Sequence, residues 1–366
     1  MKIAVVRPSR ELVHMDSNIN GREALALYDI LEEAGHEVTL MRYNYTKPKR
    51  VGFLPPKEKI RNIATYSDIP DPNVFDLIFM ASGSINFYGG VVDETITAAY
   101  HYVSLFKGKV LYLMTDVTLP FKQEWKYVRT KDYIDFDKDY CWIDNDIRVI
   151  SHFKDTDDVL KLNQKHWGNV TKAVYFPFSR WIITNTKYAK NTGEYDLVYG
   201  GLFRTANAKK GFEKYYIDSK LKSYLFGTTT EDLRSGGFGD VSHIEFGERV
   251  KPDKVIETNT KGLCTVVLGT PHCDDSAVTL RVFESILSNC VTFIDEPFDS
   301  SHFIFGDFDF LYVNSTEELV EKVKRVREDE EFRQQVLAEQ HKFIDRCKEQ
   351  NLPELMNEAI KEALSD

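Results

Sequence analysis

Residues 264–295 decide the fold class of this chain. The apolar run CTVVLG at 264–269 leads into TLRVFES at 279–285, and a second apolar run, CVTFID, follows at 290–295. Continuous apolar runs on either side of an amphipathic helix are typical of parallel strands that are buried on both faces. The segment therefore predicts a strand, a helix over 278–288 and a second parallel strand.

The same segment contains a candidate site. Arg281 and Glu284 stand three residues apart where the helix begins, so both should project from one face of its first turn. An ordinary helical Arg/Glu pair has this spacing too. The pair also suits a nucleoside diphosphate, because a carboxylate can accept two ribose hydroxyls and a guanidinium can neutralise phosphate.

Apolar strands alternate with amphipathic helices on both sides of a polar segment at 179–194. Before it, strands are predicted at 2–6, 37–43, 75–82, 110–115 and 147–151, with helices at 22–34 and within 93–105. After it, strands are predicted at 195–199 and 222–226 as well as in the opening segment. The pattern predicts an α/β protein with two doubly wound parallel-sheet domains.

The tail from 315 to 365 has apolar residues at helical spacing, interrupted by Pro353. We expect its last helix to cross back onto the first domain. The predicted domains are therefore residues 1–180, completed by a helix at about 350–366, and residues 190–346.

Composition limits the classes of protein that are compatible with the chain. Its 366 residues suit two domains, and 42% hydrophobic content can bury large cores. The five cysteines form no CxxC motif. The apolar run at the N-terminus is too short for a signal peptide or a membrane span. We expect a cytoplasmic protein without membrane contact.

Metal-binding motifs are weak. The nine histidines show no HExxH spacing, so we expect no structural metal. The DFD triplets at 135–137 and 307–309 are similar to an acidic metal motif, but we interpret them as surface turns.

The net charge of -10 argues against a uniformly basic nucleic-acid binder. A local basic stretch, interleaved with aromatic residues, nevertheless runs from 42 to 61 and includes Lys47, Lys49 and Arg50. It is either a solvated, proline-interrupted loop or a surface for DNA.

Three strand ends run into polar or glycine-rich loops: GSINFYGG at 83–90, LYLMTDVTLPF at 111–121 and DLVYGGLFR at 196–204. Ligands of open parallel sheets bind at such strand ends. These blocks, with Trp125 after the second and TLRVFES followed by IDEPFD, resemble in order those of the DNA β-glucosyltransferases of T-even bacteriophages. The resemblance covers essentially the whole length.

The resemblance implies a GT-B fold, with two Rossmann-like domains. The second domain mainly holds a UDP-sugar donor, and the first binds double-stranded DNA. The reaction would move glucose from UDP-glucose to 5-hydroxymethylcytosine, and the acceptor base would have to be flipped out of the duplex.

Residue roles carried over by this resemblance begin with Asp116 as the catalytic aspartate and Glu23 as an acidic residue at the sugar. The donor site would comprise Arg204 and Arg281 at the diphosphate, Glu284 at the ribose, Gly201 and Gly227 in turns, and Val250 at the uracil. On the DNA side it implies Lys131, to which we add Arg129, Phe87 and Tyr88 as candidates.

Structural alternatives exist for several of these residues. Asp116 could cap a turn, and Glu23 stands three residues after Asn20, at the spacing of a helix capping box. Phe87 and Tyr88 could pack beneath the Gly-Gly turn that follows them.

Two residues depart from the family pattern. Ala208 replaces a second diphosphate arginine and Leu202 replaces a serine, although Lys209 or Lys210 could restore the charge. These changes leave open whether the donor is UDP-glucose or a UDP-pentose such as UDP-arabinose. The resemblance also leaves open whether Mg²⁺ assists UDP release.

In the expected mechanism Asp116 acts as general base in a single displacement that inverts the anomeric carbon. We expect a monomer. Two alternatives are a GT-B glycosyltransferase for a small molecule or cell-surface glycan, and a nucleotide-sugar-binding protein without turnover.

Overall fold

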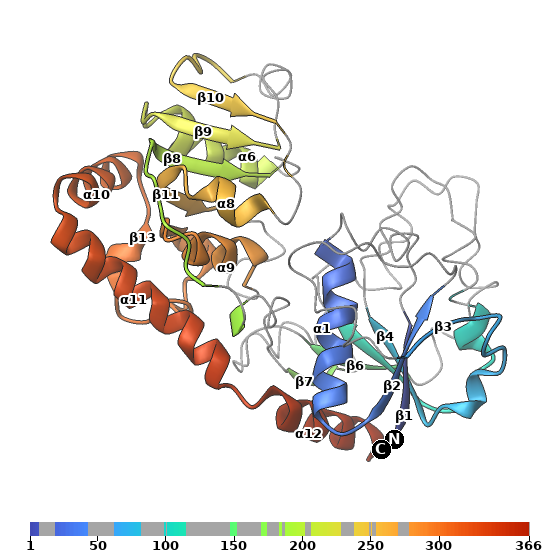
Figure 1. The fold of residues 1–366 in the computed structure, drawn as a ribbon. Coiled ribbons are helices and arrows are strands. Elements are labelled where there is room, and N and C mark those ends of the chain that lie inside the picture. Colours follow the sequence, from blue (N-terminus) through green and yellow to red (C-terminus); the bar gives the residue numbers. More distant parts are fainter. Residues whose placement is uncertain are drawn as a thin grey trace. The chain divides into compact units, whose positions relative to one another are not determined.

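The computed structural model describes residues 1–6, 19–42, 62–81, 99, 101–114, 147–151, 170–173, 183–184, 187–201, 206–227, 238–248, 250, 254–269 and 278–365. The chain divides into two units, shown as ribbons in Figure 1. Unit 1 comprises Met1–Trp181 and Asn351–Asp366, and unit 2 comprises Ile182–Gln350.

Unit 1 contains a parallel sheet of seven strands in the order β3-β2-β1-β4-β5-β6-β7. The strands are β1 (Lys2–Val6), β2 (Glu37–Arg42), β3 (Ile63–Thr65), β4 (Leu77–Ala81), β5 (Val110–Met114), β6 (Ile147–Ser151) and β7 (Val170–Ala173). Strand order reverses between β1 and β4, as in a doubly wound fold.

Two helices from opposite ends of the chain pack together in the core of unit 1. They are α1 (Ile19–Glu33) and α12 (Leu352–Leu364), which lie near each other in Figure 1. Leu352, Met356 and Ile360 are buried in the same apolar cluster as Leu27 and Leu31. The prediction that the last helix returns to the first domain is confirmed.

Polar contacts complete this junction. The Nε2 atom of His36 lies 2.7 Å from Oδ1 of Asn357, and the Asn357 amide donates to the carbonyl of Ala34 at 3.2 Å. Because α1 begins at Ile19, Asn20 lies inside the helix, so the alternative in which Asn20 caps the helix and Glu23 completes a capping box is wrong.

Unit 2 contains a parallel sheet of six strands in the order β10-β9-β8-β11-β12-β13. Its strands are β8 (Tyr195–Gly200), β9 (Ser223–Phe226), β10 (Ile244–Gly247), β11 (Gly262–Val267), β12 (Val291–Asp295) and β13 (Tyr312–Val313). Its helices are α6 (Ala206–Phe212), a π-helix at Glu213–Ile217, α8 (Val255–Asn259), α9 (Leu280–Leu287), α10 (Thr316–Glu328) and α11 (Glu330–Glu349).

The order of strands in unit 2 reverses between β8 and β11. All paired strands are parallel, so their carboxyl ends share one edge of the sheet. That edge, at the reversal, is where a doubly wound sheet binds ligands. The strand, helix and strand predicted from 264–295 correspond to β11, α9 and β12.

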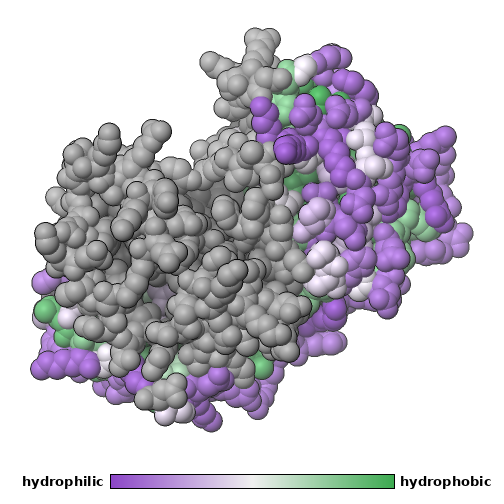
Figure 2. Space-filling view, turned by 180° about the vertical axis from the view of Figure 1, so that it is seen from behind, coloured by the Kyte–Doolittle hydropathy of each residue, from purple (hydrophilic) through white to green (hydrophobic). Residues whose placement is uncertain are grey.

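On the face drawn in Figure 2, the coloured, described residues are largely hydrophilic. Large apolar side chains that are exposed among the described residues are Met1, Val74 and Leu105. No helix in the described ranges combines the length and the apolar character that crossing a membrane requires.

Candidate nucleotide-sugar site

Two glycine turns meet at the carboxyl ends of β8 and β9. The amide of Gly201 donates to the carbonyl of Phe226 at 3.0 Å, and a Cβ atom on Gly227 would lie 3.4 Å from that same amide nitrogen. Gly201 has a φ of +138° and Gly227 a φ of +85°, conformations that favour glycine. The two glycines predicted at the nucleotide therefore lie side by side.

Arg281 reaches this turn from the first turn of α9. A Cβ atom built on Gly201 would lie 2.2 Å from Nη2 of Arg281 and 3.1 Å from its Cζ, so the guanidinium occupies the space that any side chain at 201 would need. Nη1 of Arg281 donates to the Tyr199 hydroxyl at 3.0 Å, and Cζ lies 4.8 Å from the Tyr199 ring centroid. The structure thus places a cation directly at the strand reversal.

Glu284 lies one turn further along α9 and is only 7% exposed. A carboxylate so deeply buried is stabilised by hydrogen-bonding groups around it, and a carboxylate at this position could also accept hydrogen bonds from ribose hydroxyls. Its position on the helix that carries Arg281 agrees with the spacing argument, whereas its role at a ribose stays a prediction.

Val250 follows β10 and packs against a small apolar cluster that contains Val198, Tyr224 and Phe226. The Phe226 ring also covers Gly200, where a Cβ would come within 2.4 Å of Cζ. Val250 thus packs against a cluster that reaches the end of β8, next to the glycine turns.

Lys209 lies in α6, the helix that follows the loop after β8. Its Nζ is 5.1 Å from the centroid of the Phe238 ring, a cation-π contact. Ala208 belongs to the same helix, and its side chain lies outside the described residues.

The acceptor side of the predicted site lies almost wholly outside the described residues. The backbone of Glu23 lies in α1, but its side chain is not described. The predicted acceptor-side residues outside the described ranges are Asp116, Phe87, Tyr88, Arg129, Lys131, Lys47, Lys49 and Arg50. Arg204 and Leu202, which belong to the predicted donor side, also lie outside the described residues.

Tyr199 is the residue at this site that sequence reasoning missed. It lies on β8 two residues before Gly201 and is 2% exposed. In the sequence it is one more apolar residue of DLVYGGLFR, and nothing in that pattern distinguishes it from a core tyrosine.

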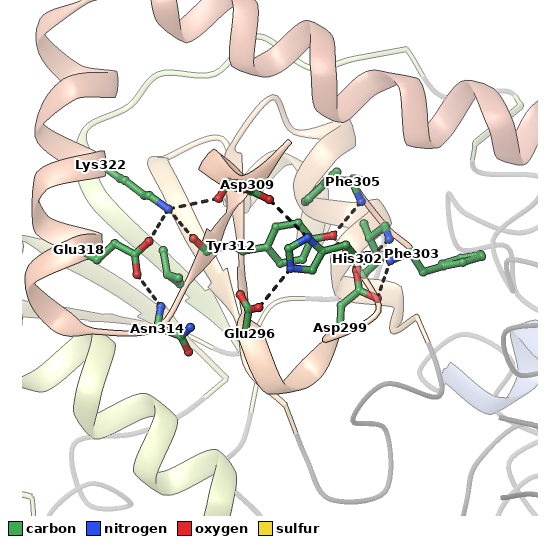
Figure 3. A network of polar contacts seen from close by, with 12 residues as sticks. Glu296, Asp299, His302, Phe303, Phe305, Asp309, Tyr312, Asn314, Glu318 and Lys322 are labelled. Carbon is green, nitrogen blue, oxygen red and sulfur yellow. Dashed lines mark hydrogen bonds and ion pairs between the residues drawn. The ribbon is translucent and has the colours of Figure 1, made fainter. Parts of the chain in front are cut away.

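A second group of charged residues surrounds the connection from β12 to β13 (Figure 3). Buried Asp299 accepts hydrogen bonds from the amides of Phe303 and Ile304 and from the Tyr312 hydroxyl. His302 stacks on Tyr312, with a centroid distance of 3.8 Å, and contacts Glu296 and Asp309. Asp309, the last residue of the second DFD triplet, therefore belongs to a loop that is held in place by these contacts.

The described residues offer a metal ion no set of ligands, since they contain no group of three or more His, Cys, Asp or Glu that could hold one. The positive charge that they place at the glycine turns comes from a guanidinium.

A doubly wound parallel sheet in each of two units is the architecture of the GT-B fold. Residues 56–182 match the family of the Bacteriophage T4 beta-glucosyltransferase, and residues 204–352 match a family described as glycosyl transferase-like.

The DNA beta-glucosyltransferase of Enterobacteria phage T4 is 26% identical over 356 residues, which cover 95% of each chain. T4 phage BGT in complex with UDP-glucose superposes with a TM-score of 0.75 and 24% identity over 98% of this chain and 99% of the other. A second structure of it, with UDP and Mn²⁺, has the same TM-score, identity and coverage. The family resemblance is thus confirmed: the chain is related over nearly its whole length to phage β-glucosyltransferases.

Proposed function

We propose that this protein transfers a sugar from a UDP-sugar to 5-hydroxymethylcytosine in duplex DNA. The observation that carries the proposal is the guanidinium of Arg281 across Gly201, at the strand reversal of a chain related end to end to a phage DNA beta-glucosyltransferase. The nearest alternative is a GT-B glycosyltransferase that acts on a small molecule or a cell-surface glycan.

In the donor half, Arg281 and Arg204 neutralise the diphosphate as UDP departs. Glu284 accepts the ribose hydroxyls, and the main chain at Val250 holds the uracil. Buried Glu284 and the guanidinium on one helix support this half of the proposal.

In the acceptor half, Asp116 accepts the proton of the hydroxymethyl group while its oxygen attacks the anomeric carbon, which is inverted. Glu23 binds the sugar. Lys131, Arg129 and the basic stretch with Lys47, Lys49 and Arg50 hold DNA, and Phe87 and Tyr88 contact the flipped base. The enzyme acts as a monomer in the cytoplasm of an infected bacterium.

Asp116→Asn tests the chemistry. The amide cannot take a proton, so we expect transfer to fall by about 10² to 10⁴-fold while UDP binding and folding are retained. The assay measures sugar-modified nucleosides by mass after digestion of the DNA. Near-normal turnover by this variant would exclude Asp116 as the base.

The donor sugar is a further proposal. Ala208 and Leu202 remove polar groups near the diphosphate of the family's site, so we propose that a UDP-pentose competes with UDP-glucose. The comparison is kcat/KM for UDP-glucose and UDP-arabinose on hydroxymethylcytosine DNA, with unmodified DNA as the acceptor control. A strong preference for glucose would show that both substitutions are neutral toward the sugar, and no transfer from any UDP-sugar would favour a binding protein.

A further inference from the structure

The Arg281 side chain is held by Tyr199 through two different parts of one ring. The hydroxyl accepts a hydrogen bond from Nη1 at 3.0 Å, and the ring centroid lies 4.8 Å from Cζ. Both contacts come from a neutral group, so they orient the guanidinium without cancelling its charge. That charge stays available to an anionic ligand.

Tyr199 is itself fixed by its surroundings. Its ring makes edge contacts with Phe212 at 5.7 Å and with Tyr216 at 5.3 Å between centroids, and these two rings stack on each other at 5.1 Å. The Tyr216 hydroxyl accepts from the Val266 amide at 2.9 Å and lies 3.2 Å from the Val198 carbonyl. The support for Arg281 is therefore tied to β8 and β11, the two strands at the reversal.

Gly201 confines the other end of the Arg281 guanidinium. Nη2 lies where a side chain at 201 would begin, so the group is confined between the Tyr199 ring and the backbone two residues further on. Arginine loses considerable rotamer freedom when it binds a ligand, and a guanidinium that is already oriented loses less.

We propose that Tyr199 is a positioning residue, which orients Arg281 for the diphosphate of the donor. This inference rests on the proposed donor role of Arg281. It adds a requirement that the resemblance did not supply: diphosphate binding depends on a buried hydroxyl that does not need to touch the ligand.

Tyr199→Phe removes the hydroxyl and keeps the ring. We expect the dissociation constant of UDP, measured by calorimetry on the full chain, to rise by about tenfold, because the variant lacks a hydrogen bond to a charged group. Tyr199→Leu removes both interactions and should raise it further. Tyr215→Phe is the matched control, since the Tyr215 hydroxyl contacts Asp295 of β12 and the Val313 carbonyl of β13 instead of Arg281. It should leave UDP affinity unchanged.

A double-mutant cycle separates positioning from a general effect on folding. Once Arg281→Ala has weakened UDP binding, adding Tyr199→Phe should cause no further loss. If Arg281→Ala weakens binding and Tyr199→Phe does not, or if the two losses add, the positioning role is wrong and the donor role stands. If Arg281→Ala leaves UDP affinity unchanged, the donor role of Arg281 fails, and the inference fails with it.

Discussion

Gly201 combines a backbone conformation that favours glycine with close contact to the charged side chain of Arg281. Its φ of +138° is unfavourable for any side chain, and a Cβ would collide with Nη2 of Arg281. Alanine would force the guanidinium away from Tyr199, so we expect Gly201→Ala to weaken UDP binding by about tenfold or more.

Gly306 provides the matched control for this substitution. It also has a positive φ, +58°, but nothing lies within 4 Å of an added Cβ. Gly306→Ala should therefore lower the free energy of unfolding by about 1 to 2 kcal/mol without changing UDP affinity. Equal UDP affinities for the two variants would show that the collision at Gly201 has no functional effect.

The site could be predicted to different depths at different residues. Arg281 and Glu284 could be predicted from the sequence because residues three apart on a helix lie on the same face. Tyr199 was not, because its partner is 82 positions away and only the strand order brings β8 next to the start of α9. A single buried tyrosine carries no local pattern that identifies what its hydroxyl contacts.

At the scale of elements, His341 connects α11 to the segment before β8. The ring of His341 stacks on Tyr188 with a centroid distance of 3.8 Å, and its Nε2 lies 2.8 Å from Oδ1 of Asn289. Burial lowers the pKa of His341 below 6.5, an effect that Asp345 partly opposes and Lys348 reinforces. The folded state therefore prefers the neutral ring.

This preference makes stability depend on pH with a defined sign. The unfolded state binds the proton more readily, so the contribution of His341 is fully present above about pH 6.5 and is lost as the pH falls toward the folded-state pKa. We expect the thermal midpoint to drop between pH 7.5 and pH 5.5, and His341→Gln to reduce that drop. His101→Gln, at an exposed position, is the control. Identical pH profiles for both variants and the parent would contradict the assignment.

Elements with strong periodicity could be predicted, and short or irregular ones could not. The sequence indicated α9, α10 and α12 because their apolar residues recur at helical spacing. β10 is a four-residue edge strand with Ile244 as its one buried residue, too short to show alternation. The π-helix after α6 was missed because nothing in EKYYI differs from an α-helical sequence; there Tyr215 and Tyr216 reach different strands.

At the scale of the whole molecule, each unit has its own core, and the last helix belongs to the first unit. Met356 is fully buried in the core of unit 1, whereas Val336 is fully buried in that of unit 2. Truncating either to alanine leaves a cavity that typically costs about 2 to 5 kcal/mol for Met and somewhat less for Val.

We expect Met356→Ala to lower the thermal transition of unit 1 alone, although the residue is in the last helix of the chain. Scanning calorimetry with and without UDP identifies the units, because a ligand held mainly by unit 2 stabilises that unit. Val336→Ala should lower the transition that UDP raises, and Met356→Ala the other one. A single transition that shifts equally in both variants would show that the two cores unfold as one.

At the scale of the whole molecule, the net charge of -10 opposes DNA binding. A polyanion is repelled by the average field of such a protein, so affinity must come from a local basic surface. We expect that neutralising Lys47, Lys49 and Arg50 together to glutamine lowers DNA affinity across sequences. It should also flatten the salt dependence by roughly 0.9 in log-log slope for each phosphate that the variant no longer neutralises.

A variant with the same charge change elsewhere separates the local surface from the overall field. Lys254, Lys342 and Lys348 have side chains that are 56%, 67% and 37% exposed in unit 2, and replacing them with glutamine removes the same three positive charges. If overall charge governs binding, both triple variants should weaken it alike. If the basic stretch binds phosphates, only the first changes the salt slope, as fluorescence anisotropy titrations at several salt concentrations would show. An unchanged slope in the first variant would move the DNA surface to Arg129 and Lys131, which are the next candidates in unit 1.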